Sequence, residues 1–401
     1  MNRRTFLAAA LAPVAAPLVA AQPKEKVKIV SSLPRVGSAK GETDGIVNAI
    51  RMALADFETA LPFEVSYADL DDTNARQGYW AAEKEAANAE KAVADGDVMA
   101  FIGPYNSGAA RVSAPILNKA GLVQVSPSAS WPGLTKSAPG ADADEPDRYR
   151  PGKKITFCRV CPHDASQGPL SADFAAEELQ VKSVFILDDK ELYGSSVATG
   201  FKKRCEALKI KILGHESIRP AAVNFRDVLK KAKGLNPDLV YFGGTTQSKA
   251  PQLAADMNAE GVDCPLLLPD GCYEQAFIDA AGADVVDVLK IFITVGGIAP
   301  AHLKGAGADF VKRYTMKHDR APGASAVYGY EAAAVVLNAL CAVGKKDREA
   351  VRKAVVSTKD FDKGLIGKWS FDADGDTTMQ RLTVATIEKG KFRAVKVMGT
   401  K

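Results

Sequence analysis

Two segments rich in serine and glycine follow apolar, strand-like runs and carry the donors that an anion requires. Residues 103–109 (GPYNSGA) follow the run 98–102, and residues 126–130 (SPSAS) follow the run 122–125. Each segment is expected to open a helix. Free backbone N–H groups and hydroxyls at the start of a helix bind anions such as a carboxylate. The two segments therefore predict a carboxylate-binding wall.

Three later segments add a phenol, hydroxyls and an acid in the same kind of position. Tyr193, Thr245 and Asp270 each lie shortly after an apolar run. A wall of donors that faces an acid suits a zwitterion, with its carboxylate on one side and its ammonium on the other. Taken singly, such residues at strand ends are more often caps and turns. Their recurrence at five strand ends favours a binding site.

The elements that must position these residues alternate between strand and helix. Apolar strand-like runs occupy residues 27–31, 63–67, 98–102, 122–125, 183–187, 210–213, 239–242 and 265–268. Helical patterns lie between them, for example at 47–57, 81–94, 111–120, 195–208 and 223–233. This alternation predicts an α/β fold with parallel sheets and helices on both faces. Ligands of such sheets bind beyond the carboxyl ends of the strands, where the polar segments fall.

The rest of the chain departs from this alternation. Residues 138–151 have the composition of a loop. After residue 305 the patterns predict three helices and then antiparallel strands. The helices are expected at 306–317, 324–343 and 348–357, and the strands at 367–371, 381–387 and 392–397.

The N-terminus has the pattern of an export signal. Arg3 and Arg4 precede an apolar run at 6–20, and small residues at 19–21 suit cleavage. The order Arg-Arg-x-Phe-Leu is similar to a twin-arginine signal. The run contains two prolines and is shorter than the ~20 residues of a membrane span. We expect removal of residues 1–21, no later run able to cross a bilayer, and a periplasmic or extracytoplasmic location. An uncleaved anchor is the alternative.

Length and charge narrow the class of protein. A chain of 401 residues exceeds the ~250–300 residues at which single cores stop growing, so two domains are expected. Lys and Arg total 52 against 48 Asp and Glu, a net charge of +4. This balance gives no basic field for a nucleic acid and no polybasic membrane patch.

The sequence gives little support for a catalytic or metal-binding motif. The six cysteines allow three disulfides of unknown pairing or buried free thiols. Cys158-x-x-Cys161 lies in a strand-like stretch without a second pair at zinc spacing. Residues 372–376 (DADGD) resemble the start of a calcium loop but lack its later glycine and glutamate, which favours a turn. Neither a dinucleotide fingerprint, a P-loop nor a nucleophile elbow is present. We expect no cofactor, no metal and no enzymatic activity.

Several short motifs occur in a distinctive order. They are 102–110 (IGPYNSGAA), 125–130 (VSPSAS), 164–168 (DASQG), 193–194 (YG), 241–244 (YFGG), 269–271 (PDG) and 367–372 (GKWSFD). Together they resemble the solute-binding proteins of the Leu/Ile/Val-binding type, which serve ABC importers. The resemblance spans about residues 26–397. It implies the type I periplasmic binding protein fold: two Rossmann-like lobes with parallel sheets, joined by a three-strand hinge, with the ligand in the cleft.

The resemblance also assigns roles in the first lobe. Ser107 would bond the ligand carboxylate through its hydroxyl. Ser128 and Ser130 would offer backbone groups, and Ser130 also its hydroxyl. Ala129, between them, belongs to the same ligand-binding set.

In the second lobe, the resemblance pairs Asp270 with the α-ammonium of the ligand and closes Tyr193 over it. Thr245 stands where family members often carry Tyr, which implies a wider pocket. The segment 34–42 also departs from the family pattern and brings Arg35 and Lys40 near the expected cleft mouth.

The implied hinge divides the chain into discontinuous lobes. The three crossings are expected near 159–164, 294–298 and 366–370. The N-terminal lobe would then comprise 26–161 and 298–365, and the C-terminal lobe 162–297 and 366–401.

These observations predict an exported, monomeric solute-binding protein that captures an amino acid, of the branched-chain type, for an ABC permease. The alternatives are the extracellular sensor of a signalling system with the same fold and an exported α/β enzyme. A sensor would be supported by fused transmembrane and kinase regions. An enzyme would require a nucleophile–base pair or a metal cluster.

Overall fold

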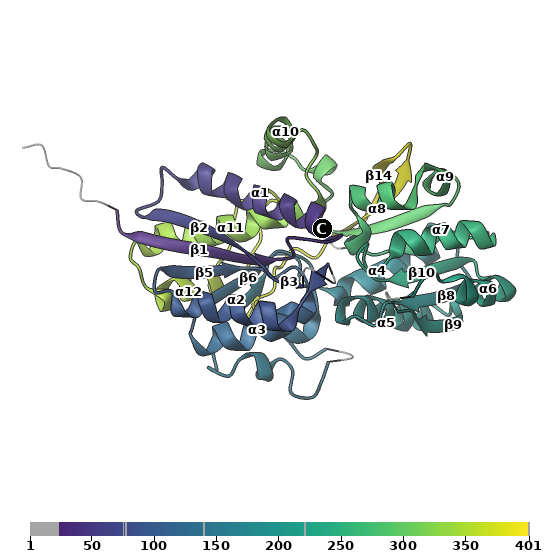
Figure 1. The fold of residues 1–401 in the computed structure, drawn as a ribbon, viewed down its shortest axis with the longest axis horizontal. Helices are drawn as coiled ribbons and strands as arrows, with labels where there is room; N and C mark the ends of the chain where they lie inside the picture. The colour runs from purple at the N-terminus through teal and green to yellow at the C-terminus, as the bar shows by residue number, and fades with distance from the viewer. Residues whose placement is uncertain (1–23, 75, 77, 139–140, 220–221, 400–401) are drawn as a thin grey trace, which may run out of the picture.

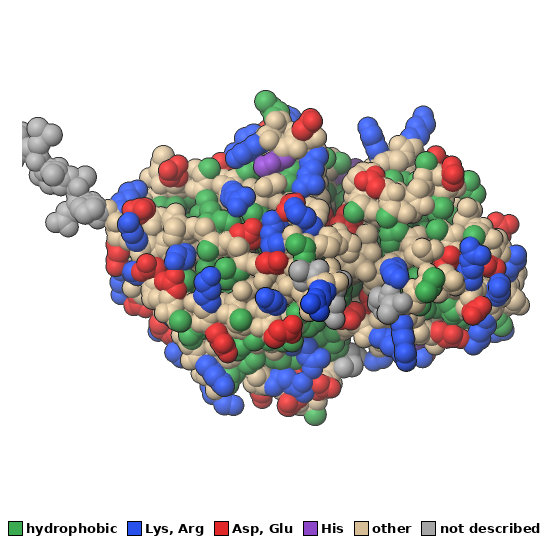
Figure 2. All heavy atoms as spheres, viewed as in Figure 1, with side chains coloured by type: hydrophobic (Ala, Val, Ile, Leu, Met, Phe, Trp, Pro, Cys, Tyr) green, Lys and Arg blue, Asp and Glu red, His purple; other side chains and the backbone are tan. Residues whose placement is uncertain are grey.

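The computed structural model describes residues 24–74, 76, 78–138, 141–219 and 222–399. The expected signal segment, 1–21, lies outside the described residues. The chain forms two α/β lobes that lie side by side along the long axis of the molecule (Figure 1). The predicted α/β class with parallel sheets is confirmed. On the face shown in Figure 2, basic and acidic side chains are interspersed over both lobes.

The first lobe is built on a parallel sheet with strand order β2-β1-β5-β6-β7. Its strands are β1 (Lys26–Leu33), β2 (Glu64–Asp71), β5 (Val98–Ile102), β6 (Val123–Ser126) and β7 (Phe157–Arg159). A hairpin of β3 (Thr73–Asn74) and β4 (Tyr79–Trp80) stands beside it. Every residue of β5 is buried, which explains its uninterrupted apolar sequence, VMAFI.

Helices from two parts of the sequence cover this sheet. They are α1 (Lys40–Phe57), α2 (Ala82–Ala94) and α3 (Ser107–Lys119), and then α10 (Ala306–His318), α11 (Ala324–Val343) and α12 (Arg348–Val356). The short turns η1 (Pro132–Leu134), η2 (Asp147–Tyr149) and η4 (Pro300–His302) complete the lobe.

The second lobe has a mixed sheet with strand order β14-β13-β12-β11-β10-β8-β9. Its strands are β8 (Ser183–Asp188), β9 (Lys211–Ser217), β10 (Leu239–Gly243), β11 (Leu266–Leu268), β12 (Ile291–Gly296), β13 (Leu382–Glu388) and β14 (Lys391–Met398). Its helices are α4 (Asp164–Glu177), α5 (Leu192–Ala207), α6 (Arg226–Leu235), α7 (Ala250–Glu260), α8 (Gln275–Ala281) and α9 (Ala283–Val286), with the turn η3 (Asp270–Cys272). The pairings of β12 with β13 and of β13 with β14 are antiparallel, so β13 alone runs against the other strands of this sheet.

The strand order places a ligand crevice in each sheet. The chain reverses its direction of growth between β1 and β5 in the first sheet and between β8 and β10 in the second. Such switch points open a crevice beyond the carboxyl ends of the strands. The polar segments that the sequence analysis singled out follow β5, β6, β8, β10 and β11, and so lie at these ends.

The third crossing between the lobes lies later than the expected 366–370. Ile366, Trp369 and Phe371 belong to the core of the first lobe. There Glu331 of α11 accepts hydrogen bonds from the Ile366 N–H and the Trp369 indole N–H, both at 3.0 Å. Residues 367–371 form isolated bridges and no strand. The chain therefore returns to the second lobe only after this segment. The second expected crossing, 294–298, begins inside strand β12.

The expectation that no later run is long and apolar enough to cross a bilayer is wrong for one helix. By length and composition α11 would suffice to span a membrane, but it is mostly buried within the first lobe. It lies against α1, where a Cβ on Gly329 would come within 2.9 Å of Ile46. A glycine is needed at this contact, and the apolar sequence of α11 is that of a core helix.

The structure decides between disulfides and free thiols for the six cysteines. All six are free thiols. Four of them are buried: Cys158, Cys161, Cys205 and Cys272. Large apolar cores on both lobes make covalent cross-links unnecessary for the fold.

Candidate functional site

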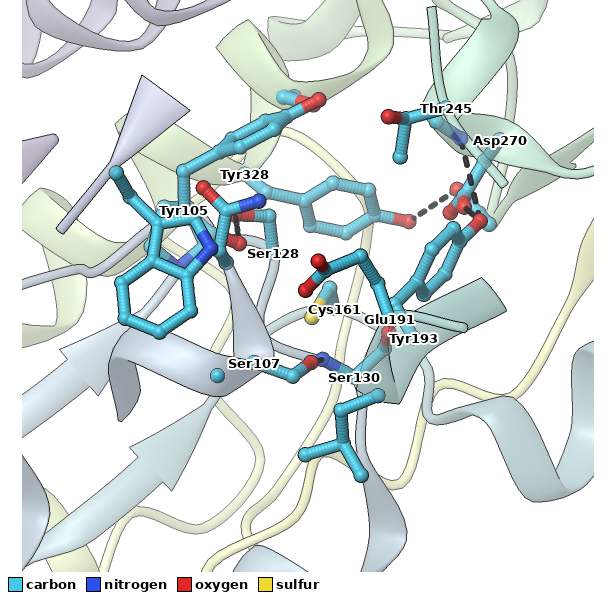
Figure 3. A pocket seen from close by; sticks show the side chains of 18 of the residues that line it. Tyr105, Ser107, Ser128, Ser130, Cys161, Glu191, Tyr193, Thr245, Asp270 and Tyr328 are labelled. Atoms are coloured by element: carbon cyan, nitrogen blue, oxygen red, sulfur yellow. Dashed lines mark hydrogen bonds between the residues drawn. The ribbon is translucent and has the colours of Figure 1, made fainter. Parts of the chain in front are cut away.

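A cavity with an empty volume of about 770 Å³ lies between the two lobes (Figure 3). Six of the seven residues proposed from the sequence line it. They are Ser107, Ser128 and Ser130 from the first lobe and Tyr193, Thr245 and Asp270 from the second. Ala129 is fully buried and is not among the lining residues.

Ser107 presents a free hydroxyl proton to the cavity. It is the first residue of α3, and its Oγ accepts the backbone N–H groups of Ser130 at 3.1 Å and Trp131 at 3.2 Å. Because the oxygen already accepts two bonds, the hydroxyl is best used as a donor. Its position at the N-terminus of α3 adds the positive end of the helix dipole.

The segment 126–130 uses its backbone N–H groups internally. The Ser126 Oγ accepts the N–H groups of Ser128 at 3.2 Å and Ala129 at 2.8 Å. The Ser128 hydroxyl donates to the Tyr105 carbonyl at 2.9 Å. The Ser130 hydroxyl is buried and makes no hydrogen bond with the described residues. The hydroxyls of Ser107 and Ser130, rather than the backbone N–H groups of residues 128–130, are therefore the donors that this wall offers.

This segment does not open an α-helix, contrary to expectation. It is followed by the single turn η1, and Leu134 and Tyr149 pack against α3 of the first lobe. The Trp131 indole N–H donates to Glu145 at 3.0 Å, and Trp131 is buried against Tyr149 outside the cavity. The expected loop at 138–151 thus has a buried anchor.

Asp270 forms the acidic wall opposite the serines. It begins η3, directly after β11, and accepts a hydrogen bond from the Tyr193 hydroxyl (Figure 3). The Gly271 N–H donates to the same Tyr193 oxygen at 3.2 Å. Burial raises the pKa of Asp270 above its ordinary value. A bound cation would restore the ionised form.

Thr245 closes one side of this wall. Its N–H donates to the Ser248 Oγ at 2.7 Å, so the residue also helps to fix the turn that leads into α7.

Two acids that the sequence analysis did not count also line the cavity. Asp189 and Glu191 follow β8 in the same segment as Tyr193. Asp189 is only 2% exposed, its Oδ1 accepts the Glu191 N–H at 2.9 Å, and burial raises its pKa to about 7. The Glu191 side chain extends from the second lobe into the middle of the cavity (Figure 3). Asp189 and Glu191 follow the end of a predicted strand, and this position is the sequence signal that could have identified them.

Aromatic residues complete the cavity and were also missed. Tyr79 and Trp80 come from the small hairpin, Tyr105 from the segment after β5, and Tyr328 from α11. A Cβ on Gly108 would lie 2.5 Å from the Trp80 ring, so a glycine is required for this close contact. No local sequence pattern links these positions, because they meet only in the folded chain.

The basic residues expected at the cleft mouth are engaged elsewhere. Arg35 pairs with Asp44 at 2.6 Å and Asp69 at 3.1 Å, and Lys40 also pairs with Asp44 at 2.6 Å. Neither basic residue lines the cavity.

A buried ion pair holds the serine segment in place. The Arg159 Nε lies 2.7 Å from the Asp376 Oδ1, and both side chains are almost fully buried. The Arg159 Nη1 also donates to the carbonyls of Ala129 at 3.0 Å and Trp131 at 2.7 Å. Arg159 is the last residue of β7, so these bonds fix the serine segment to the end of that strand.

The fold and the cleft agree with the comparison to known families. The profile of the periplasmic binding protein family matches residues 26–391, and the chain belongs to that family. Its members are solute-binding proteins, not enzymes, and they act outside the cytoplasmic membrane and deliver solutes to ABC permeases.

The chain is similar to proteins of several bacteria. The Leu/Ile/Val-binding protein homolog 1 of Brucella abortus is 27% identical over 320 residues, which are 80% of this chain and 78% of the relative. The crystal structure of a leucine-binding protein from Thermotoga maritima has a TM-score of 0.81 at 24% identity, covering 93% of this chain and 98% of that one. A branched-chain amino acid transporter substrate-binding protein from Streptococcus pneumoniae, in complex with isoleucine, has a TM-score of 0.80 at 23% identity, with 93% and 99% covered.

Proposed function

We propose that this protein captures an α-amino acid between its lobes and delivers it to an ABC permease. The observation that carries the proposal is the arrangement of the cavity. Free hydroxyl donors on Ser107 and Ser130 stand on the first lobe, and the carboxylate of Asp270 stands on the second. The serines would bind the ligand carboxylate and Asp270 its ammonium.

Similar proteins of known structure support the same class of ligand. The one from Thermotoga maritima is a leucine-binding protein, and the one from Streptococcus pneumoniae is in complex with isoleucine. The proposal extends to export by the twin-arginine signal, a monomeric state, and a hinge that closes when the ligand touches both lobes.

Isothermal titration calorimetry on the purified chain, unfolded and refolded to remove bound solute, tests the proposal. The panel comprises amino acids, their amides, urea and aromatic acids. An α-amino acid should bind and, at one hundred times its Kd, should stabilise the protein by about 2.7 kcal/mol. Binding only by ligands without an α-amino group would contradict the role of Asp270.

A further inference from the structure

The cavity is lined by more acidic side chains than a simple zwitterion can pair with. Asp189, Glu191 and Asp270 line it, and no Lys, Arg or His is among the described residues that do so. On the proposed function, the α-ammonium of the ligand balances Asp270. Two carboxylates then remain, while the ligand's own carboxylate faces the serine hydroxyls.

Neither Asp189 nor Glu191 has a basic partner among the described residues. Burial raises the pKa of both acids, that of Asp189 to about 7, so a cation at this place would favour their ionised forms. Asp189 is 98% buried, and ionised groups are costly to bury without a partner of opposite charge. Glu191 reaches into the cavity, and Asp189 lies behind it in the same segment, where its Oδ1 accepts the Glu191 N–H at 2.9 Å.

An independent observation shows that this cavity is built to hold a ligand with a polar head. The Ser130 hydroxyl lines the cavity, is 95% buried, and has no hydrogen-bond partner among the described residues. Buried hydroxyls are normally bonded. Burial raises the pKa of the Asp164 carboxyl, and the Ser130 hydroxyl near it opposes that rise. An acceptor on a ligand would supply the bond that the described residues leave unmade. Ser130 belongs to the first lobe, whereas the Glu191 side chain enters from the second (Figure 3).

Aromatic side chains fit the remaining part of such a ligand. Tyr79, Trp80 and Tyr105 line the cavity together with Glu191. The faces of aromatic rings attract cations, and apolar surfaces cover the methylene stem of a long basic side chain.

We propose that the ligand is an α-amino acid with a second positive charge at the end of its side chain, held by Glu191 with Asp189 behind it. Lysine and arginine are the simplest ligands of this class. This inference rests on the proposed function and narrows it. A branched aliphatic side chain, by contrast, would leave both carboxylates without a partner.

Lysine and norleucine make the matched pair of ligands for the test, because they share the same four-carbon stem and only lysine carries the terminal amine. Calorimetry on the refolded chain should give lysine or arginine at least a tenfold lower Kd than norleucine. Glu191→Gln should raise the Kd of lysine about ten- to hundredfold, a cost of about 1.4–2.8 kcal/mol, and leave that of norleucine nearly unchanged.

Asp284→Asn provides the control variant, since Asp284 is exposed on α9 and outside the cavity. It should leave the Kd of lysine unchanged. The comparison of lysine with norleucine uses the unmodified protein, so its result does not depend on whether a variant folds.

Two negative results separate this inference from the proposed function. Binding of leucine or norleucine as tight as that of lysine and arginine would overturn the inference and leave the proposed function standing. Failure of every α-amino acid to bind would overturn both.

Equal binding of cadaverine, which has the two amines but no carboxylate, would retain the cationic end and refute the role of the serines.

Discussion

On the proposed function, Asp270 makes the strongest single contact with the amino acid. Its carboxylate is buried, bonded to Tyr193, and lies across the cavity from Ser107 and Ser130. Tyr193 reaches it from the start of α5, so two segments of the second lobe fix its position.

Replacement of Asp270 by Asn should therefore weaken the binding of any α-amino ligand. Loss of a buried charge partner costs about 2–5 kcal/mol, since the ammonium is left without its counter-charge. Titration calorimetry gives the change, and Asp263→Asn, at an exposed position of the same lobe, serves as the control. An unchanged affinity in Asp270→Asn would refute the ammonium assignment.

The serines should differ from one another in a way that the hydrogen bonds explain. Ser107→Ala removes a free donor and should cost about 1.5–3 kcal/mol of ligand binding, the value of a hydrogen bond to a charged group. Ser128→Ala should cost less, because the Ser128 hydroxyl already donates to Tyr105. Dissociation constants of the two variants for one amino acid provide the test. A larger loss in Ser128→Ala would contradict this reading of the site.

At the scale of elements, the site depends on a segment that is neither helix nor strand. Residues 126–131 are held by Ser126, by the Ser107 hydroxyl and by Arg159. Arg159 in turn needs Asp376, whose segment belongs to a different part of the sequence.

The charge state of Asp376 should appear in the stability of the protein. Burial opposes ionisation of Asp376, but the charges of Arg159 and Lys136 outweigh it and hold the pKa of Asp376 below its ordinary value. A carboxyl with a lowered pKa in the folded state stabilises the fold at pH values above its unfolded pKa of about 3.9. That contribution is lost as the pH falls toward the folded-state pKa.

Asp376→Asn should thus lower the free energy of unfolding by about 3–5 kcal/mol at pH 7, since it leaves Arg159 buried without its partner. The difference from the unmodified protein should shrink below pH 4. Urea unfolding at several pH values measures both effects. Asp374→Asn, which removes a half-exposed acid two residues away, should cost less than about 1 kcal/mol. Equal effects of the two variants would argue against a special role for the buried pair.

At the scale of the whole molecule, the cavity is made by both lobes and by the way they face each other. Ligand groups that bind Ser107 and Asp270 together connect the lobes, so the bound state favours the closed form.

A saturating amino acid should accordingly reduce the radius of gyration of the protein in small-angle X-ray scattering. Asp270→Asn at the same ligand concentration should remain near the ligand-free value, because the second lobe loses its contact. A radius that does not change in the unmodified protein, despite binding measured by calorimetry, would refute closure by the ligand. The forward scattering of the same samples reports whether the chain is a monomer.

The sequence alone determined the α/β class and the strand ends at which polar residues gather. Both follow from local properties: the period of apolar residues sets strand or helix, and parallel strands send their carboxyl ends to one edge. Six of the seven proposed residues accordingly line one cavity. Strand β12 was missed because its apolar run was assigned to a crossing.

Tertiary structure decided which groups are free to bind. Arg35 and Lys40 are engaged by Asp44, the N–H groups of residues 128–130 are used within the first lobe, and Glu331 retains residues 365–369 there. It also placed Trp80 and Tyr328 beside Glu191 in one cavity. Such partnerships join residues far apart in sequence, and a hydrogen bond or ion pair depends on distance in space, which no local pattern encodes.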